Sequence, residues 1–207
     1  CNGAFIKVNN KFIKKSYINN HRLLKVLEDM NKRYKIGGVF LMCEEYNFVV
    51  PKQEFGLRNR IGFSLYQFWQ GIYKEKTIKN DKILHQALDN AKIYKIMIFF
   101  GPSKKKMIYC YNAMNEMIKL YPDFAFAYNG PSIEMSNSNA TKALAVKQYL
   151  DYLKIKHDNV MVVGDSGNDL SMLNAFKHSF TMKQASEEVK SQAKNLISRL
   201  HELEKYL

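Results

Sequence analysis

Hydrophobic and polar residues follow two different periods along the chain, and the period predicts the element. Alternation around Asn9 and Asn10 is typical of a hairpin, whereas apolar residues every three or four positions are typical of an amphipathic helix. In chain order we expect a hairpin over residues 1–14, a helix over 23–30, a strand over 39–42, a helix around 81–90, a strand over 94–100, a helix over 111–120, strands over 124–128 and 132–135, a helix over 141–154, a strand over 160–163, and helices over 170–176 and 187–207.

The order of these elements differs between the middle and the end of the chain. Strand, helix, strand, tight turn and strand over residues 94–135 indicate an α+β unit. Helix, apolar strand and helix over residues 141–176 indicate a parallel α/β sheet in which the strand 160–163 is central. With 207 residues, the chain is long enough for two small domains.

Composition makes an anionic partner plausible and favours a reducing compartment. The alternative is that most of the scattered lysines form an ordinary solvated surface. Lys and Arg total 32 against 19 Asp and Glu, a net charge of +13, which suits a phosphate ester or a nucleic acid. No apolar run approaches the roughly 20 residues that span a bilayer. The three cysteines lie far apart and no export leader opens the chain, so we expect a cytoplasmic protein without a disulfide framework.

Two carboxylates follow the apolar strand directly, in the stretch VMVVGDSGND over residues 160–169. Ligands of parallel sheets bind at the carboxyl ends of the strands, which is where Asp165 and Asp169 are expected. A hard divalent cation with oxygen ligands, Mg²⁺ above all, relieves the repulsion between two such acids. The alternative to a metal site is an ordinary turn in which Asp169 only caps the following helix. EF-hand, Walker and dinucleotide-binding patterns do not fit the sequence.

The same stretch, together with Thr141-Lys142-Ala143-Leu144-Ala145 ahead of it, resembles the haloacid dehalogenase superfamily, and most closely its Cof-type sugar-phosphate phosphatases. The resemblance implies that Lys142 clamps the phosphate and the nucleophile. It implies that Asp165 binds Mg²⁺, and that Asp169 supports the metal site or the lysine. Asn168 corresponds to a polar residue facing the phosphate, and Asn2, in Asn2-Gly3-Ala4, lies close to it.

The resemblance also implies a fold and a reaction. We expect a Rossmann-like α/β core, with a parallel sheet in a three-layer arrangement, built from residues 1–14 and 133–207, and a large inserted α+β cap over residues 15–132. The expected reaction is Mg²⁺-dependent hydrolysis of a small phosphorylated metabolite, such as a sugar phosphate, through an aspartyl-phosphate. The catalytic set is Lys142, Asp165 and Asp169. Asn2, Lys142 and Asn168 bind the substrate, and Asp165 and Asp169 bind the metal.

One part of the family pattern is not in the sequence. Family members begin with a strand that ends Asp-x-Asp-Gly-Thr and carries the nucleophile, and this chain starts at Cys1-Asn2-Gly3. We therefore expect a fragment with little activity of its own, in which the strand 160–163 has lost a neighbour and exposes unpaired backbone groups.

Two alternatives belong to other classes. The positive charge and 13 Tyr and 13 Phe would suit a nucleic-acid-binding or non-catalytic phosphate-binding protein, although the lysines are dispersed and no recognised binding motif is present. Cys1 could also serve as an N-terminal nucleophile whose own amine acts as base. Salt-dependent oligonucleotide binding would support the first alternative, and amide hydrolysis that alkylation abolishes would support the second.

Overall fold

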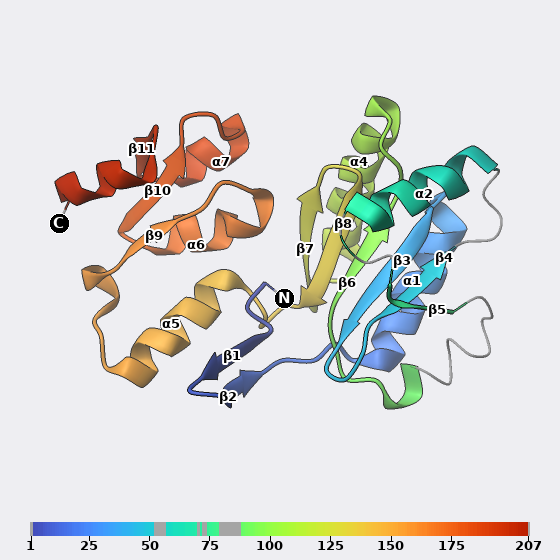
Figure 1. The fold of residues 1–207 in the computed structure, drawn as a ribbon, viewed down its shortest axis with the longest axis horizontal. Helices are drawn as coiled ribbons and strands as arrows, with labels where there is room; N and C mark the ends of the chain where they lie inside the picture. Colours follow the sequence, from blue (N-terminus) through green and yellow to red (C-terminus); the bar gives the residue numbers. More distant parts are fainter. Residues whose placement is uncertain (1, 52–56, 70, 72–73, 79–87, 207) are drawn as a thin grey trace. The chain divides into compact units, whose positions relative to one another are not determined.

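A computed structural model describes residues 2–51, 57–69, 71, 74–78 and 88–206. The chain divides into two compact units. Figure 1 colours the ribbon by residue number, from blue at the N-terminus to red at the C-terminus. Unit 1 takes residues 16–138, and unit 2 takes residues 2–15 together with residue 139 onward. Each unit is described separately below.

Unit 1 is built on a mostly antiparallel sheet. Its described strands are ordered β5-β4-β3-β6-β8-β7, and only the β4–β5 pair is parallel. The elements of the unit are α1 (Asn20–Arg33), β3 (Gly38–Cys43), β4 (Phe48–Pro51), α2 (Leu57–Trp69), β5 (Lys76–Thr77), β6 (Ile93–Phe99), α4 (Lys104–Leu120), β7 (Phe124–Asn129) and β8 (Ser132–Asn137).

The two faces of this sheet are covered by different helices. On one face, residues such as Ile96 and Ile98 of β6 pack against the apolar stripes of α1 and α4 in the larger hydrophobic cluster. On the other face, Phe63 and Tyr66 of α2 pack against Phe99, with ring centroids 5.4 and 4.5 Å apart. Because successive side chains of a strand point to opposite faces, one continuous apolar run supplies both layers.

Unit 2 holds a parallel sheet with helices around it. The described strands of this sheet are ordered β11-β10-β9, and a separate hairpin of β1 and β2 belongs to the same unit. The elements are β1 (Phe5–Val8), β2 (Lys11–Lys15), α5 (Lys142–Leu153), β9 (Met161–Val163), α6 (Leu170–Ala175), β10 (His178–Met182), α7 (Glu187–Gln192), β11 (Asn195–Ile197) and 3-10 turns at 157–159, 167–169 and 200–206.

The expected helix over residues 187–207 is wrong. The structure ends α7 at Gln192, places β11 beside β10 in parallel, and finishes with a 3-10 turn. Pairing of β11 with β10 buries Ile197 completely, whereas Leu196 and Leu200 are exposed. The apolar residues that are spaced as in a helix therefore do not form one buried helix face. Sheet pairing therefore overrides the local period. The strand β10 was not predicted, and β9 lies at the edge of the described sheet instead of its centre.

The expected domain limits can be compared with the two compact units. The predicted core begins at residue 133, inside β8, which pairs with β6 and β7 in the sheet of unit 1. The compact units divide after Ser138, and the predicted domain limits stay a prediction. The helix expected around 81–90 falls largely outside the described residues. Across the described part of the chain, no helix is both long and apolar enough to cross a membrane.

Candidate active site

The loop that follows β9 is fixed at both ends by backbone contacts. Val163 is in register with Phe180 of β10, and the Gly164 N–H donates to the Phe180 carbonyl at 3.1 Å. A 3-10 turn over Gly167–Asp169 then leads into α6. The loop therefore leaves the sheet at the carboxyl end of a strand, the position at which parallel sheets bind ligands.

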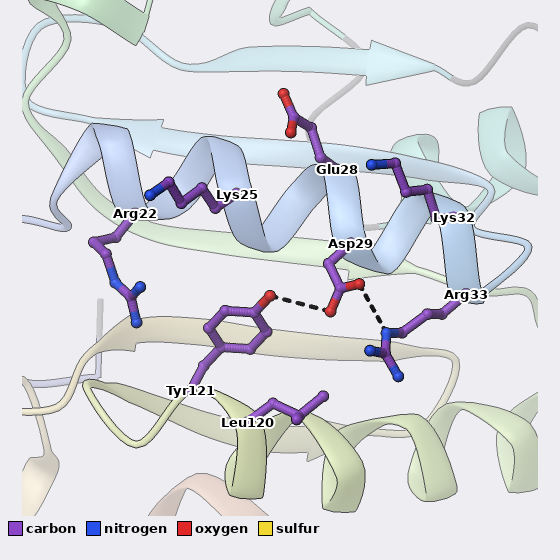
Figure 2. Close-up of a pocket in the computed structure, with 8 residues that line it drawn as sticks. All are labelled: Arg22, Lys25, Glu28, Asp29, Lys32, Arg33, Leu120 and Tyr121. Atoms are coloured by element: carbon purple, nitrogen blue, oxygen red, sulfur yellow. Dashed lines mark hydrogen bonds and ion pairs between the residues drawn. The ribbon is translucent and has the colours of Figure 1, made fainter.

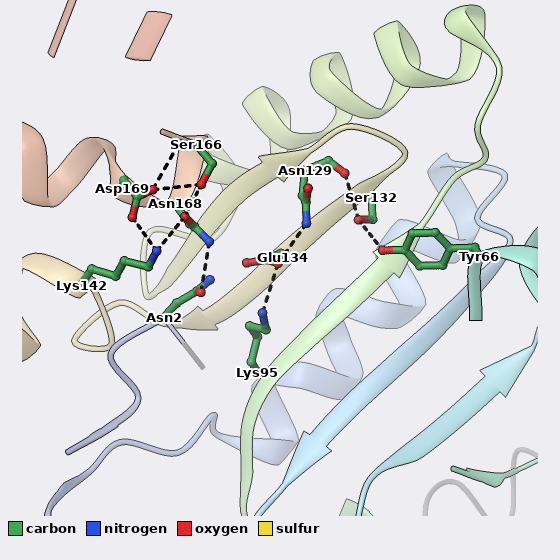
Figure 3. Close-up of polar contacts among 10 residues, drawn as sticks. All are labelled: Asn2, Tyr66, Lys95, Asn129, Ser132, Glu134, Lys142, Ser166, Asn168 and Asp169. Atoms are coloured by element: carbon green, nitrogen blue, oxygen red, sulfur yellow. Dashed lines mark hydrogen bonds and ion pairs between the residues drawn. The ribbon is translucent and has the colours of Figure 1, made fainter. Parts of the chain in front are cut away.

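Asp169 is the centre of this loop, and both of its carboxylate oxygens are already used (Figure 3). Oδ1 accepts from Nζ of Lys142 at 2.5 Å. Oδ2 accepts from the backbone N–H groups of Asp165 and Ser166 at 3.1 and 3.2 Å, and Ser166 Oγ lies 3.0 Å away. The side chain of Asp169 is only 5% exposed. Its carboxylate thus organises the turn and anchors the lysine.

The ionisation of Asp169 follows from these contacts. Burial alone would favour the neutral acid, but the Lys142 ammonium, the Asp165 N–H and the Ser166 hydroxyl together hold the pKa of Asp169 below its usual value. The carboxylate is therefore charged at neutral pH and gives Lys142 a fixed anionic partner. The two residues lie in different elements, at the start of α5 and just before α6.

Glycine is required at position 164 because Asp169 comes so close. A Cβ at this position would lie 2.5 Å from the Cβ and 2.7 Å from the Cγ of Asp169. Such distances do not occur between ordinary side chains, so any larger residue has to displace the carboxylate. The glycine of the sequence motif thus permits the contact between Asp169 and the turn.

Lys142 opens α5, where Thr141 caps the helix by accepting from the Leu144 N–H at 3.2 Å. Its ammonium also donates to Oδ1 of Asn168 at 3.1 Å. About a third of the Lys142 side chain, 34%, remains exposed. The ammonium therefore carries a positive charge that is oriented by two partners and still reachable from solvent.

Asn2 completes the group from the other end of the chain. The amide of Asn168 donates to Oδ1 of Asn2 at 3.4 Å. The backbone of Asn2 and Gly3 has positive φ values of 49° and 92°, and a Cβ on Gly3 would lie 2.3 Å from the Thr141 carbonyl oxygen. Glycine at position 3 thus lets the start of the chain pass against the first turn of α5.

Asp165 behaves differently from Asp169. The residue is exposed, and among the described residues its carboxylate has no hydrogen-bond or ion-pair partner. The part of the chain that the structure describes contains no cluster of three or more His, Cys, Asp or Glu side chains that could hold a metal. Asp165 fits a Mg²⁺ ion that takes one or two carboxylates and keeps several waters. Asp169 Oδ1 accepts one hydrogen bond and keeps a second lone pair, so the place of Asp169 in the metal site stays a prediction.

A family sequence model, described as haloacid dehalogenase-like hydrolase, matches residues 1–202. The chain belongs to the haloacid dehalogenase-like hydrolase family. The family predicted from the residues 141–145 and 160–169 is therefore confirmed.

Two curated relatives carry phosphatase names. A phosphoglycolate phosphatase of Picrophilus torridus is 35% identical over 68 residues, which are 33% of this chain and 29% of that protein. The 5-amino-6-(5-phospho-D-ribitylamino)uracil phosphatase YwtE of Bacillus subtilis is 28% identical over 131 residues, 60% of this chain and 44% of that protein. The matched part is thus less than half the length of either relative.

Solved structures of this haloacid dehalogenase-like hydrolase fold match nearly the whole chain. SMU.1108c of Streptococcus mutans has a TM-score of 0.79 at 17% identity, covering 99% of this chain and 74% of the other. The subclass IIB sugar phosphatase BT4131 has a TM-score of 0.75 at 18% identity, covering 99% and 73%. The predicted α/β fold, a Rossmann-like core with a cap, is confirmed by these matches.

The structure brings all five predicted site residues together within unit 2. Lys142, Asn168 and Asp169 form one hydrogen-bonded set, Asn2 joins it through Asn168, and Asp165 belongs to the same turn. Sequence reasoning missed Ser166, which forms a capping box with Asp169. The Ser-x-x-Asp spacing ahead of a helix is the signal that could have revealed it.

A hollow of about 400 Å³ in unit 1 does not offer a comparable site (Figure 2). It runs along α1 and is lined by Arg22, Lys25, Glu28, Asp29, Lys32, Arg33, Leu120 and Tyr121. The positive charges are balanced: Arg22 pairs with Asp123, and Arg33 pairs with Asp29 and Glu116, at 2.7 to 3.0 Å. Exposed pairs of this kind contribute little and leave no net charge to attract an anion.

Proposed function

We propose that this chain carries the phosphate-binding and metal-binding part of a phosphatase that hydrolyses a small phosphate monoester. The observation that carries the proposal is the oriented ammonium of Lys142, held by Asp169 and Asn168 at the carboxyl end of β9. The cation is oriented before any ligand arrives, which is what electrostatic stabilisation of a phosphoryl group requires. Family membership favours this function over the nucleic-acid-binding alternative.

The proposed roles follow from the hydrogen bonds. Lys142 neutralises charge on the phosphoryl oxygens while Asp169 keeps the ammonium in place, so Asp169 is a positioning residue. The side-chain amides of Asn168 and Asn2 offer polar contacts beside the lysine. Asp165 supplies the exposed carboxylate for Mg²⁺, which when bound neutralises phosphate charge and polarises the phosphorus–oxygen bonds.

The nucleophile of the proposed reaction is a carboxylate that would form an aspartyl-phosphate. Asp169 is unsuited to attack because its two oxygens accept from Lys142 and from the turn. The family pattern Asp-x-Asp-Gly-Thr, which would supply the nucleophile, does not occur in the 207 residues. We therefore propose that the attacking carboxylate is supplied by a residue other than Asp169.

Small phosphorylated metabolites are the proposed substrates. The names of the relatives specify phosphoglycolate, a phosphoribitylaminouracil and a sugar phosphate for those proteins. A reducing cytoplasm remains the proposed location, since Cys43 and Cys110 are free thiols. Burial raises the pKa of both thiols to about 12, which makes them poor nucleophiles. Cys1, the alternative nucleophile, lies outside the described residues.

The test measures phosphate release from p-nitrophenyl phosphate with and without Mg²⁺. The 207-residue chain is assayed beside any longer product of the same gene that carries the nucleophile motif, and the genomic sequence around Cys1 shows whether such a product is encoded. We expect Asp165→Ala to abolish the Mg²⁺-dependent release of whichever product is active. Asp158→Ala is the matched control, because Asp158 is also exposed but precedes β9. Equal Mg²⁺-dependent rates for the Asp165→Ala variant and its parent would refute the assignment.

A further inference from the structure

The helix α2 of unit 1 carries a stripe of large hydrophobic side chains on an exposed face. Ile61, Leu65, Phe68 and Trp69 follow one another at helical spacing, so they share one side of the helix. Their exposed fractions are 52, 65, 70 and 78%. The last three are the most exposed large hydrophobic residues in the part of the chain that the structure describes. Apolar stripes of this kind normally face a core.

The other face of α2 is fixed to the sheet of unit 1. Phe63 and Tyr66 are buried and belong to the smaller hydrophobic cluster together with Phe99. The Tyr66 hydroxyl lies 3.0 Å from Oγ of Ser132 in β8 (Figure 3). α2 therefore has two apolar faces, and the sheet covers one of them.

The exposed stripe lies in an uncharged stretch of a highly charged chain. Residues 61–73 contain no Asp, Glu, Lys, Arg or His, whereas Asp, Glu, Lys and Arg make up 25% of the whole sequence. The centres of protein–protein interfaces are depleted of charged residues and enriched in aromatic ones. The composition of this face is therefore typical of an interface between proteins.

The exposed area is large enough for the centre of a small dimer interface. Aromatic side chains can bury roughly 150–250 Å² each, so at their exposed fractions the four residues present on the order of 500 Å². That value lies at the upper end of the largest apolar patches on typical monomers. Two such patches face to face would remove on the order of 1,000 Å² from water, about the lower limit for a specific interface.

The spacing of the stripe makes it complementary to itself. Ile61 and Trp69 lie four residues before and four residues after Leu65. In an antiparallel helix pair with its two-fold axis at Leu65, the two Leu65 side chains meet. Ile61 of each copy then lies at the level of the partner's Trp69, beside the partner's Phe68. A two-fold interface requires a patch that matches its own copy, and this stripe meets that requirement.

We propose that α2 pairs with α2 of a second copy of this chain, antiparallel and with Leu65 on the two-fold axis. The inference concerns unit 1 and does not depend on the proposed function. A charged partner is disfavoured, because residues 61–73 offer it no charge to pair with. The net charge of +13 on each copy opposes association, so added salt should strengthen the dimer.

Sedimentation equilibrium of the 207-residue chain measures this association, in about 0.3 M NaCl to screen the repulsion. We expect twice the mass of the chain at about 100 µM and the mass of one chain at about 1 µM, because the interface is small. Trp69 is the single tryptophan of the sequence, so its fluorescence reports on the stripe directly. Its emission should shift to shorter wavelength over the same concentration range.

Two opposite substitutions at Leu65 test the position of the two-fold axis. Leu65→Glu and Leu65→Lys each bring like charges together, so each should weaken the dimer at least about a hundredfold. An equimolar mixture of the two variants should form a heterodimer, since opposite charges then meet. Ile108→Glu in α4 is the matched control, because Ile108 is 57% exposed in the same unit. This control should associate as the parent does.

A parent that stays monomeric over the whole concentration range would overturn the inference. A dimer that persists in Leu65→Glu, for example through the edge of β9, would overturn it as well. So would a mixture of the two Leu65 variants that stays monomeric. An emission of Trp69 that is already shifted in a monomeric parent would also contradict it, because the stripe would then be covered within a single chain.

Discussion

Replacing Asp169 by asparagine removes the charge at the centre of the loop with almost no change in volume. The carboxylate accepts from Lys142 through one oxygen and from two backbone N–H groups through the other. An asparagine can present only one oxygen, and its NH₂ group faces donors on the other side. The variant therefore leaves either Lys142 or the turn without its acceptor.

The size of the effect follows from burial and from the kind of hydrogen bond. Hydrogen bonds to a charged group contribute about 1.5–3 kcal/mol each, and they are not additive. Breaking a fully buried ion pair costs about 3–5 kcal/mol. Because 34% of the Lys142 side chain is exposed, solvent screens part of this loss. We expect Asp169→Asn to lower the free energy of unfolding of unit 2 by about 2–4 kcal/mol.

The same contacts predict how this difference varies with pH. The folded pKa of Asp169 is lowered, whereas the unfolded value is about 3.9. A group with a depressed folded pKa contributes stability that is fully present above the unfolded pKa and is lost as the pH falls through the folded pKa. The difference in free energy of unfolding between the parent and the Asp169→Asn variant should therefore be largest at neutral pH. This difference should become smaller below about pH 4.

Urea denaturation monitored by hydrogen exchange of peptides from unit 2 measures this difference without assuming that both units unfold together. Asp165→Asn is the matched control, since it alters an exposed carboxylate of the same turn and should change the stability by less than about 0.5 kcal/mol. The reasoning fails if the two variants are equally stable at pH 7. It also fails if the gap between parent and Asp169→Asn widens as the pH falls.

Two further predictions concern the residues that position the loop and the lysine. Gly164→Ala should lower the free energy of unfolding in urea by about 1–3 kcal/mol, because the new Cβ would overlap Asp169. The control is Gly62→Ala in α2, where the nearest atom to a new Cβ is 3.9 Å away, and it should be neutral or stabilising. Equal effects of the two substitutions would contradict the argument. Thr141→Ala should lower the free energy of unfolding by about 1 kcal/mol in the same measurement, because it removes the cap of α5. Thr141→Ser keeps a hydroxyl and should keep most of the parent's stability. An equal loss of stability with both substitutions would contradict the capping role.

The hairpin, α5, β9 and α6 of unit 2 could be predicted from the sequence because their signals are local. The stripe of apolar residues over 141–154 and the run over 160–163 coincide with α5 and β9 to within one residue. The asparagines at 9 and 10, both with positive φ, turn the predicted hairpin. The resemblance to the haloacid dehalogenase superfamily also named five residues, which the fold brings together within unit 2.

What escaped prediction depends on contacts between distant segments. Apolar residues over 187–207 are spaced as in a helix, but Ile197 pairs with Met182 as part of a parallel sheet. This pairing depends on a strand that is distant in the sequence, so the local pattern does not reveal it. The burial of Asp169 and its hydrogen bonds to the turn could not be read from the sequence, since both acids follow the same strand. Lys95 stands alone in an apolar run, and its partner Glu134 is identified by strand register.

The central claim is that Lys142, with Asp169 behind it, binds a phosphate group. The most direct measurement is an NMR titration of the 207-residue chain with inorganic phosphate, monitoring the Lys142 ammonium and the side-chain amides of Asn2 and Asn168. We predict saturable shifts at these three groups, and their loss in Lys142→Met. Shifts confined to other residues, or shifts that persist unchanged in Lys142→Met, would contradict the claim.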